Sequence, residues 1–113
     1  MIAVAAGWPC LLWHEALTWL QPAMTHGGET DEAEVTAQLD CGRAQLWLAI
    51  DGNVRAALVT TRHGDRLHLW LCGGNGCDWP GLLRQIMAFV ADSGVTRWTL
   101  DGRPGWSRVL KGR

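Results

Sequence analysis

The feature that most constrains the fold is a strand, helix and strand order in the last third of the chain. Residues 66–71 (RLHLWL) alternate polar and apolar side chains, as strands do. Asp78 is a good N-cap, and the apolar side chains that follow it have helical spacing up to Gly94. Residues 95–100 (VTRWTL) again have strand character. This order predicts a right-handed crossover between parallel neighbours, and therefore an α/β fold.

The middle of the chain predicts an antiparallel meander. Residues 44–50 (AQLWLAI), 54–61 (VRAALVTT) and 66–71 have strand character, and the turns DGN and RHGD separate them. Glycine in each turn supplies the backbone freedom that a tight hairpin needs. In the third strand, regular alternation predicts that the leucines lie on one face of the sheet and that the side chains between them lie on the other. The leucines are Leu67, Leu69 and Leu71, and the opposite face carries His68 and Trp70.

The first third of the chain predicts a short strand and two helices. Residues 1–6 form an apolar run compatible with a strand. Residues 8–20 place apolar side chains at three- and four-residue intervals, and Pro22 predicts the end of that helix. A second helix is expected to begin at Asp31, which suits a capping box, and to end near Gly42.

Composition indicates one compact domain over residues 1–113, because 48% of the residues are hydrophobic and 19% are charged. The chain has four cysteines and no evident secretory signal, which favours reduced thiols over a disulfide framework. The apolar start is interrupted by Gly7, Pro9 and His14, so we expect no membrane span. These features predict a protein of the cytosol, or of a particle assembled there.

Charge is unevenly distributed along the sequence. Residues 1–42 contain acidic side chains but no Lys or Arg, whereas the end of the chain is basic. Trp106 and the arginines around it allow three interpretations: binding of nucleic acid, a protein interface, or packing of the tryptophan on the sheet. Nucleic acid is least favoured because the net charge is −1 and no nucleic-acid motif is present. We expect Trp106 to pack, and a protein partner to contact this tail through Arg103, Trp106, Arg108 and Arg113.

The predicted order of elements resembles the GNAT superfamily of N-acetyltransferases. The segment RLHLWLCGGNGCDWPGLLRQIMAFVADSGVTRWTL is similar to the acyl-CoA unit of that family, in which a strand diverges from its parallel neighbour and the next helix points at a pyrophosphate. The ending SGVTRWTLDGRPGWSRVLKG resembles small GNAT-like proteins encoded by tailed bacteriophages, through its Gly-Arg-x-Gly-Trp element. The resemblance implies a mixed central sheet flanked by helices and shortened at the C-terminus.

The resemblance also implies a cofactor-binding loop for acetyl-CoA. Gly74-Asn75-Gly76 supplies the family's Gly-x-Gly, whose backbone N–H groups would bind the pyrophosphate. Leu71 stands where relatives carry Arg or Gln, so the cationic group is missing. Asp78 adds a carboxylate at the helix start, which opposes a phosphate ligand. The cofactor-binding residues that the resemblance implies are Leu71, Gly73, Gly74, Asn75 and Gly76.

Catalytic groups are weakly represented. The family commonly uses a Tyr as the acid, and this chain has no Tyr. The remaining candidates are side chains that can carry protons near neutral pH. The bases are His68, Glu15 and Glu29, and the acids are Cys72 and Cys77.

A metal site is a less favoured interpretation of the same thiols. His68, Cys72 and Cys77, with His63 or Cys41 as a fourth ligand, are more loosely spaced than the paired ligands of structural zinc. We therefore expect no metal. We also expect the family's C-terminal strand pair, which walls the acceptor site, to be absent.

Two functions follow from these sequence features. The preferred hypothesis is a phage-encoded, non-catalytic GNAT-like protein that acts as a virion-associated or assembly component through contacts with phage structural proteins or with copies of itself. It needs no cofactor, no membrane and no nucleic acid, and it would reside in the host cytoplasm or the virion. The alternative is a small N-acetyltransferase that depends on acetyl-CoA.

Overall fold

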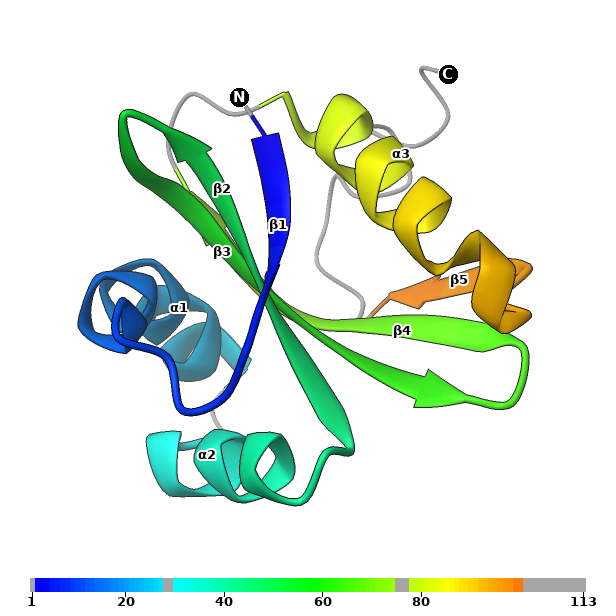
Figure 1. The fold of residues 1–113 in the computed structure, drawn as a ribbon. Coiled ribbons are helices and arrows are strands. Elements are labelled where there is room, and N and C mark those ends of the chain that lie inside the picture. The colour runs from blue at the N-terminus through cyan, green and yellow to red at the C-terminus, as the bar shows by residue number, and fades with distance from the viewer. Residues whose placement is uncertain (1, 28–29, 75–77, 101–113) are drawn as a thin grey trace.

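A computed structural model describes residues 2–27, 30–74 and 78–100 (Figure 1). Described strands and helices follow the predicted order. They are β1 (Ile2–Ala6), α1 (Trp13–Gly27), α2 (Glu32–Asp40), β2 (Ala44–Asp51), β3 (Asn53–His63), β4 (Arg66–Gly74), α3 (Trp79–Val90), a 3₁₀ turn η1 (Ala91–Ser93) and β5 (Arg97–Leu100).

The strands form one mixed sheet in the order β1-β2-β3-β4-β5. The first three pairings are antiparallel, and β5 lies parallel to β4 as the crossover predicted. Gly52 and Gly64 stand in the two hairpin turns with φ of 76° and 66°, a region that glycine enters without the strain a side chain would add. The meander and the parallel pair are therefore confirmed.

Helices cover both faces of the sheet, which gives two layers of core (Figure 1). On one face, α1 and α2 bury Leu20 and Val35 against Leu46 and Leu48 of β2. On the other face, α3 buries a second apolar cluster that includes Leu83 and Ile86 of the helix and Trp47, Leu58 and Leu69 of the sheet. We call these the α1/α2 face and the α3 face. The predicted fold class, a mixed sheet flanked by helices, is confirmed.

The prediction for the first helix was wrong at both ends. It begins at Trp13 rather than near Trp8, and it continues through Pro22. Proline removes one backbone hydrogen bond inside a helix. The helix nevertheless extends past Pro22 because its buried stripe, Ala16, Leu20 and Met24, spans the proline and packs in the core. Among the described helices, none is both long enough and apolar enough to cross a lipid bilayer.

The predicted second helix is confirmed, with its N-cap. The side chain of Asp31 accepts a hydrogen bond of 2.8 Å from the backbone N–H of Glu34. The helix ends at Asp40, and Gly42 follows with a φ of 78°. An aspartate cap and a left-handed glycine are the local signals that helix ends require.

One strand face differs from the prediction because β4 contains a β-bulge. Val59 pairs with Leu71, but the next residue, Thr60, pairs with Leu69, so Trp70 is an extra residue in β4. Beyond the bulge, each residue therefore points to the face opposite the one that unbroken alternation predicts. Leu69 packs on the α3 face, whereas Leu71 is buried on the α1/α2 face.

Candidate functional site

The structure describes β5 as far as Leu100, and up to there β5 pairs with the first half of β4. β5 pairs with residues 66–69 of β4, and its last pair is Leu69 with Leu100. β4 continues to Gly74, and its other edge stays paired with β3 up to Ala56 opposite Gly74. Residues 70–74 thus lie beyond the pairs that the structure describes between β4 and β5. We call this stretch the open edge of β4.

The β-bulge lies where the open edge begins. Trp70 is the extra residue, and it directly follows Leu69, the last residue of β4 with a described partner in β5. A bulge bends its strand and strengthens the local twist, so the two halves of β4 run in different directions. Bulges of this kind are frequent next to binding sites.

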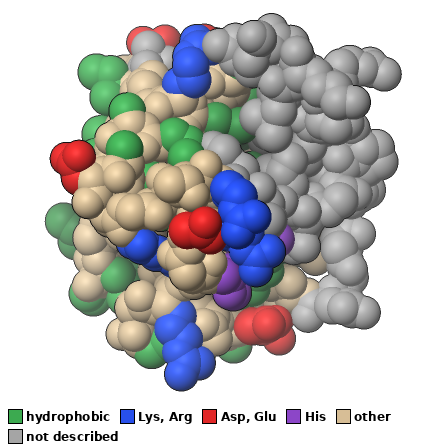
Figure 2. Space-filling view, turned by 90° about the vertical axis from the view of Figure 1, so that its right-hand side faces the viewer, with side chains coloured by type: hydrophobic (Ala, Val, Ile, Leu, Met, Phe, Trp, Pro, Cys, Tyr) green, Lys and Arg blue, Asp and Glu red, His purple; other side chains and the backbone are tan. Residues whose placement is uncertain are grey.

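An ion pair fixes the other end of the β4–β5 pair. A guanidinium nitrogen of Arg97 lies 3.2 Å from a carboxylate oxygen of Asp65, in the β3–β4 turn. The backbone carbonyl of Asp65 also accepts from the N–H of Thr96, at 2.8 Å. The Arg97 hydrogen bond is the main cause that lowers the pKa of Asp65 below its usual 3.8. Figure 2 shows this side of the molecule, where charged side chains of both signs lie together.

Two glycines of the predicted cofactor loop belong to β4 itself. A Cβ added to Gly73 would lie 1.9 Å from the carbonyl oxygen of Trp19 in α1, and one added to Gly74 would lie 2.5 Å from the Cβ of Ala56. Both positions therefore require glycine because α1 and β3 approach the backbone of β4 closely. Sequence reasoning missed this packing role, although two adjacent glycines in a strand are a signal for it.

The other predicted cofactor residues are placed as follows. Leu71 is buried in the core of the α1/α2 face, so its side chain is not available to a ligand. Asn75 and Gly76 lie outside the described residues. The role of all five residues in cofactor binding stays a prediction.

The start of α3 carries the predicted carboxylate. The side chain of Asp78 accepts a hydrogen bond of 3.1 Å from the backbone N–H of Gly81, which confirms Asp78 as the N-cap. A Cβ on Gly81 would lie 2.3 Å from a carboxylate oxygen of Asp78. The cap thus occupies one of the N–H groups that a bound anion would use, and it adds a negative charge there.

The candidate catalytic side chains are not brought together. His68 lies opposite Thr61 on the α1/α2 side of the sheet, half-buried, and its ring centre is 6.1 Å from that of His63. Cys72 is buried on the α3 face, because the bulge between His68 and Cys72 reverses the alternation of side chains. Glu15 is exposed in the first turn of α1, while Glu29 and Cys77 lie outside the described residues.

The same geometry argues against His68 and Cys72 as ligands of one metal ion, since they point to opposite faces of the sheet. Over the part of the chain that the structure describes, no three His, Cys, Asp or Glu side chains come close enough to hold a metal. The predicted partner interface, Arg103, Trp106, Arg108 and Arg113, lies outside the described residues.

Comparison with known proteins identifies the fold. No protein-family model matches the sequence, and no curated protein sequence matches it either. Among solved structures, a probable acetyltransferase superposes on 99% of this chain and 87% of its own, with a TM-score of 0.74 and 11% identity.

A second structure is that of N-acetylglutamate synthase from Neisseria gonorrhoeae, complexed with coenzyme A and N-acetyl-glutamate. The match covers 99% of this chain and 28% of that one, with a TM-score of 0.69 and 11% identity. These likenesses concern the fold, since identity is low. The chain therefore has the mixed α/β, GNAT-like fold that acetyltransferases share.

Proposed function

We propose that this protein binds an acyl-coenzyme A at the open edge of β4. The observation that carries the proposal is the β-bulge at Trp70, which bends the second half of β4 and is followed by Gly73 and Gly74, two positions without side chains. The likeness to a structure that holds coenzyme A supports it.

The open edge suits the pantetheine arm of coenzyme A. That arm is extended and carries two amide groups, so it can pair with a strand edge as an added strand does. Backbone N–H and C=O groups away from water need hydrogen-bond partners, and the amides supply them. Leu71 points into the core and glycines 73 and 74 carry no side chain, so little side-chain bulk lies along this stretch.

The phosphates of the ligand would lie toward the start of α3. Helix N-termini bind anions through free N–H groups and the helix dipole. The Asp78 carboxylate is a repulsive element there, so we expect the affinity to be moderate rather than high.

Binding of an acyl-coenzyme A along β4, the strand that carries His68, favours acyl transfer to an amine as the chemistry. His68 lies on β4 two residues before the bulge, and an imidazole is the commonest general base near neutral pH. The amine nitrogen would attack the thioester carbonyl, His68 would take the proton of the amine, and the thiolate of coenzyme A would leave.

Calorimetric titration of the full chain with acetyl-coenzyme A tests the proposal. We expect saturable binding in the range of about 1–100 µM, corresponding to roughly 5.5–8 kcal/mol. Gly76→Asp adds a second carboxylate two residues before Asp78 in the sequence and should abolish binding. Gly7→Asp, the same change at an open position in the β1–α1 connection, is the matched control and should bind as the parent does. Equal binding by both variants would contradict the assignment of the coenzyme A site.

A second candidate function is a protein-contact role in a phage particle, without catalysis. Exposed apolar side chains near the start of the chain favour it: Ile2 is 63% exposed, and Leu11 is fully exposed. Burial of such side chains against a partner would remove their apolar surface from water, which is favourable. The opposite charges of the two ends of the sequence would allow copies to associate acidic face to basic tail.

Sedimentation velocity at low and high salt tests this second function. We expect self-association that weakens as salt screens the charges and that disappears in the double variant Arg103→Glu, Arg108→Glu. A monomer under every condition would exclude self-association through these charges.

A further inference from the structure

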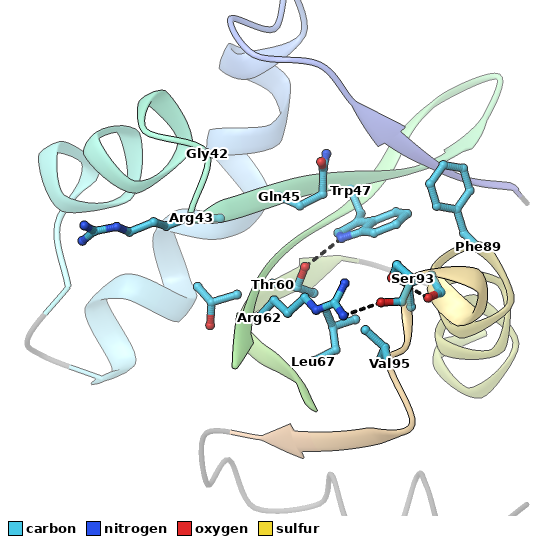
Figure 3. Close-up of a pocket in the computed structure, with 13 residues that line it drawn as sticks. Gly42, Arg43, Gln45, Trp47, Thr60, Arg62, Leu67, Phe89, Ser93 and Val95 are labelled. Atoms are coloured by element: carbon cyan, nitrogen blue, oxygen red, sulfur yellow. Dashed lines mark hydrogen bonds between the residues drawn. The ribbon is translucent and has the colours of Figure 1, made fainter. Parts of the chain in front are cut away.

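A cavity of about 210 Å³ lies on the α3 face, between the C-terminal end of α3 and the sheet (Figure 3). Leu67, near the start of β4, and Val95, just before β5, form part of its wall. It therefore lies at the end of β4 opposite the open edge, and it is independent of the proposed coenzyme A site.

The interior of the cavity is mainly apolar. Trp47 is buried, and its indole N–H donates to the hydroxyl of Thr60 at 2.9 Å, so its polar atom is already satisfied. Phe89 of α3 meets the Trp47 ring edge to face, with 5.3 Å between the ring centres. Phe89 is nevertheless 67% exposed. An aromatic ring this exposed beside a cavity gains apolar contact if a ligand enters.

Arg62 brings a positive charge to the wall of the cavity. In Figure 3 the Arg62 side chain extends toward η1, whereas the Arg43 side chain points away from the cavity. The Nε of Arg62 donates to the carbonyl of Gly64 at 3.0 Å, and one Nη donates to the carbonyl of Ser93. Both acceptors are neutral, and a guanidinium has five N–H donors. Among the described residues that line the cavity, none is Asp or Glu.

We propose that this cavity binds a small carboxylate that carries a single aromatic ring. The ring would lie against Trp47, Phe89 and Leu67, and the carboxylate would accept hydrogen bonds from the remaining donors of Arg62. The size is adequate, because an apolar cavity of roughly 150 Å³ already holds benzene. The larger volume leaves room for the carboxylate arm.

Titration of the full chain with phenylacetate, followed by tryptophan fluorescence and calorimetry, tests the inference. Saturation below about 1 mM is expected, and an excess of acetyl-coenzyme A should not displace the probe. The neutral analogue 2-phenylethanol should bind more weakly. No saturation by about 10 mM phenylacetate, or displacement by acetyl-coenzyme A, would overturn the proposal.

Variants separate the ring from the charge. Arg62→Gln should weaken phenylacetate about tenfold or more, the loss of one charge-assisted hydrogen bond, and leave 2-phenylethanol unchanged. Arg84→Gln, an exposed position of α3 outside the cavity, is the matched control. Phe89→Ala should weaken the binding of both ligands. Because Phe89 is largely exposed, we expect this variant to fold. Unchanged affinities in both cavity variants would contradict the site, as would a dimer that Phe89→Ala dissolves, since a second copy would then be the occupant.

Discussion

The backbone of Gly73 in β4 lies directly against the carbonyl oxygen of Trp19 in α1. A Cβ at position 73 would be 1.9 Å from that oxygen, far inside van der Waals contact. The oxygen belongs to a helix backbone, so it cannot rotate away as the end of a side chain can. This contact sets how closely α1 packs on the second half of β4, and hence the shape of the open edge.

Gly73→Ala should destabilise the fold by about 1–3 kcal/mol or more, because overpacking against a backbone forces the helix to move. Gly7→Ala is the matched control, since a Cβ there meets nothing within 4 Å, and it should change stability little. Urea unfolding of the three proteins measures the difference. Equal midpoints would show that α1 does not press on Gly73.

Asp78→Asn should raise the affinity for acetyl-coenzyme A a few-fold. Asn caps helices about as well as Asp, so the hydrogen bond to Gly81 is kept while the negative charge is removed. Asp78→Ala removes the cap as well and should cost about 1 kcal/mol of stability. Calorimetry and thermal unfolding separate the two effects. Unchanged affinity in Asp78→Asn would mean that the phosphates do not approach α3.

Thr60→Val should destabilise the protein by about 1–3 kcal/mol. The change removes the acceptor of the buried Trp47 N–H, and an unsatisfied buried donor bears its full desolvation cost. Thr18→Val, on the exposed side of α1, is the control and should stay within about 0.5 kcal/mol. Denaturant unfolding provides the measurement. A neutral result for Thr60→Val would imply that water enters the cavity and replaces the hydroxyl.

The Asp65 pair should make stability depend on pH in acid. The hydrogen bond from Arg97 lowers the pKa of Asp65 below 3.8, so the folded state favours the carboxylate. Its stabilising contribution is therefore complete at neutral pH and is lost as pH falls below 3.8 through the lowered folded value. Both side chains are exposed, so the effect is small.

The measurement is the stability difference between the parent and Asp65→Asn, taken from urea unfolding at neutral and acid pH. We expect the difference to vanish in acid. In an Arg97→Gln background, most of the pH dependence of that difference should already be absent. A difference that stays constant with pH would mean that Arg97 does not stabilise the carboxylate.

Local signals explain why much of the fold could be predicted from the sequence. The caps at Asp31 and Asp78 and the hairpin glycines act within a few residues of their positions, so spacing alone reveals them. The crossover followed because a short strand, helix and strand has one favoured hand. The fold class is set by these elements together.

The errors arose where distant residues decide. Pro22 remains helical because the α1 stripe packs on the sheet, and the bulge at Trp70 depends on pairing with β3, which no short window contains. That bulge moves Leu71 to the α1/α2 face and separates His68 from Cys72. The open edge of β4 could be expected from the family resemblance, but the close contact between Gly73 and Trp19 could not.

Amide hydrogen exchange with and without coenzyme A tests the central claim most directly. If coenzyme A pairs with the open edge of β4, the amides of residues 70–74 that face β5 should exchange more slowly in its presence, while exchange at Ala5 in the edge strand β1 should not change. Binding without added protection in residues 70–74, or no binding at millimolar coenzyme A, would contradict the account.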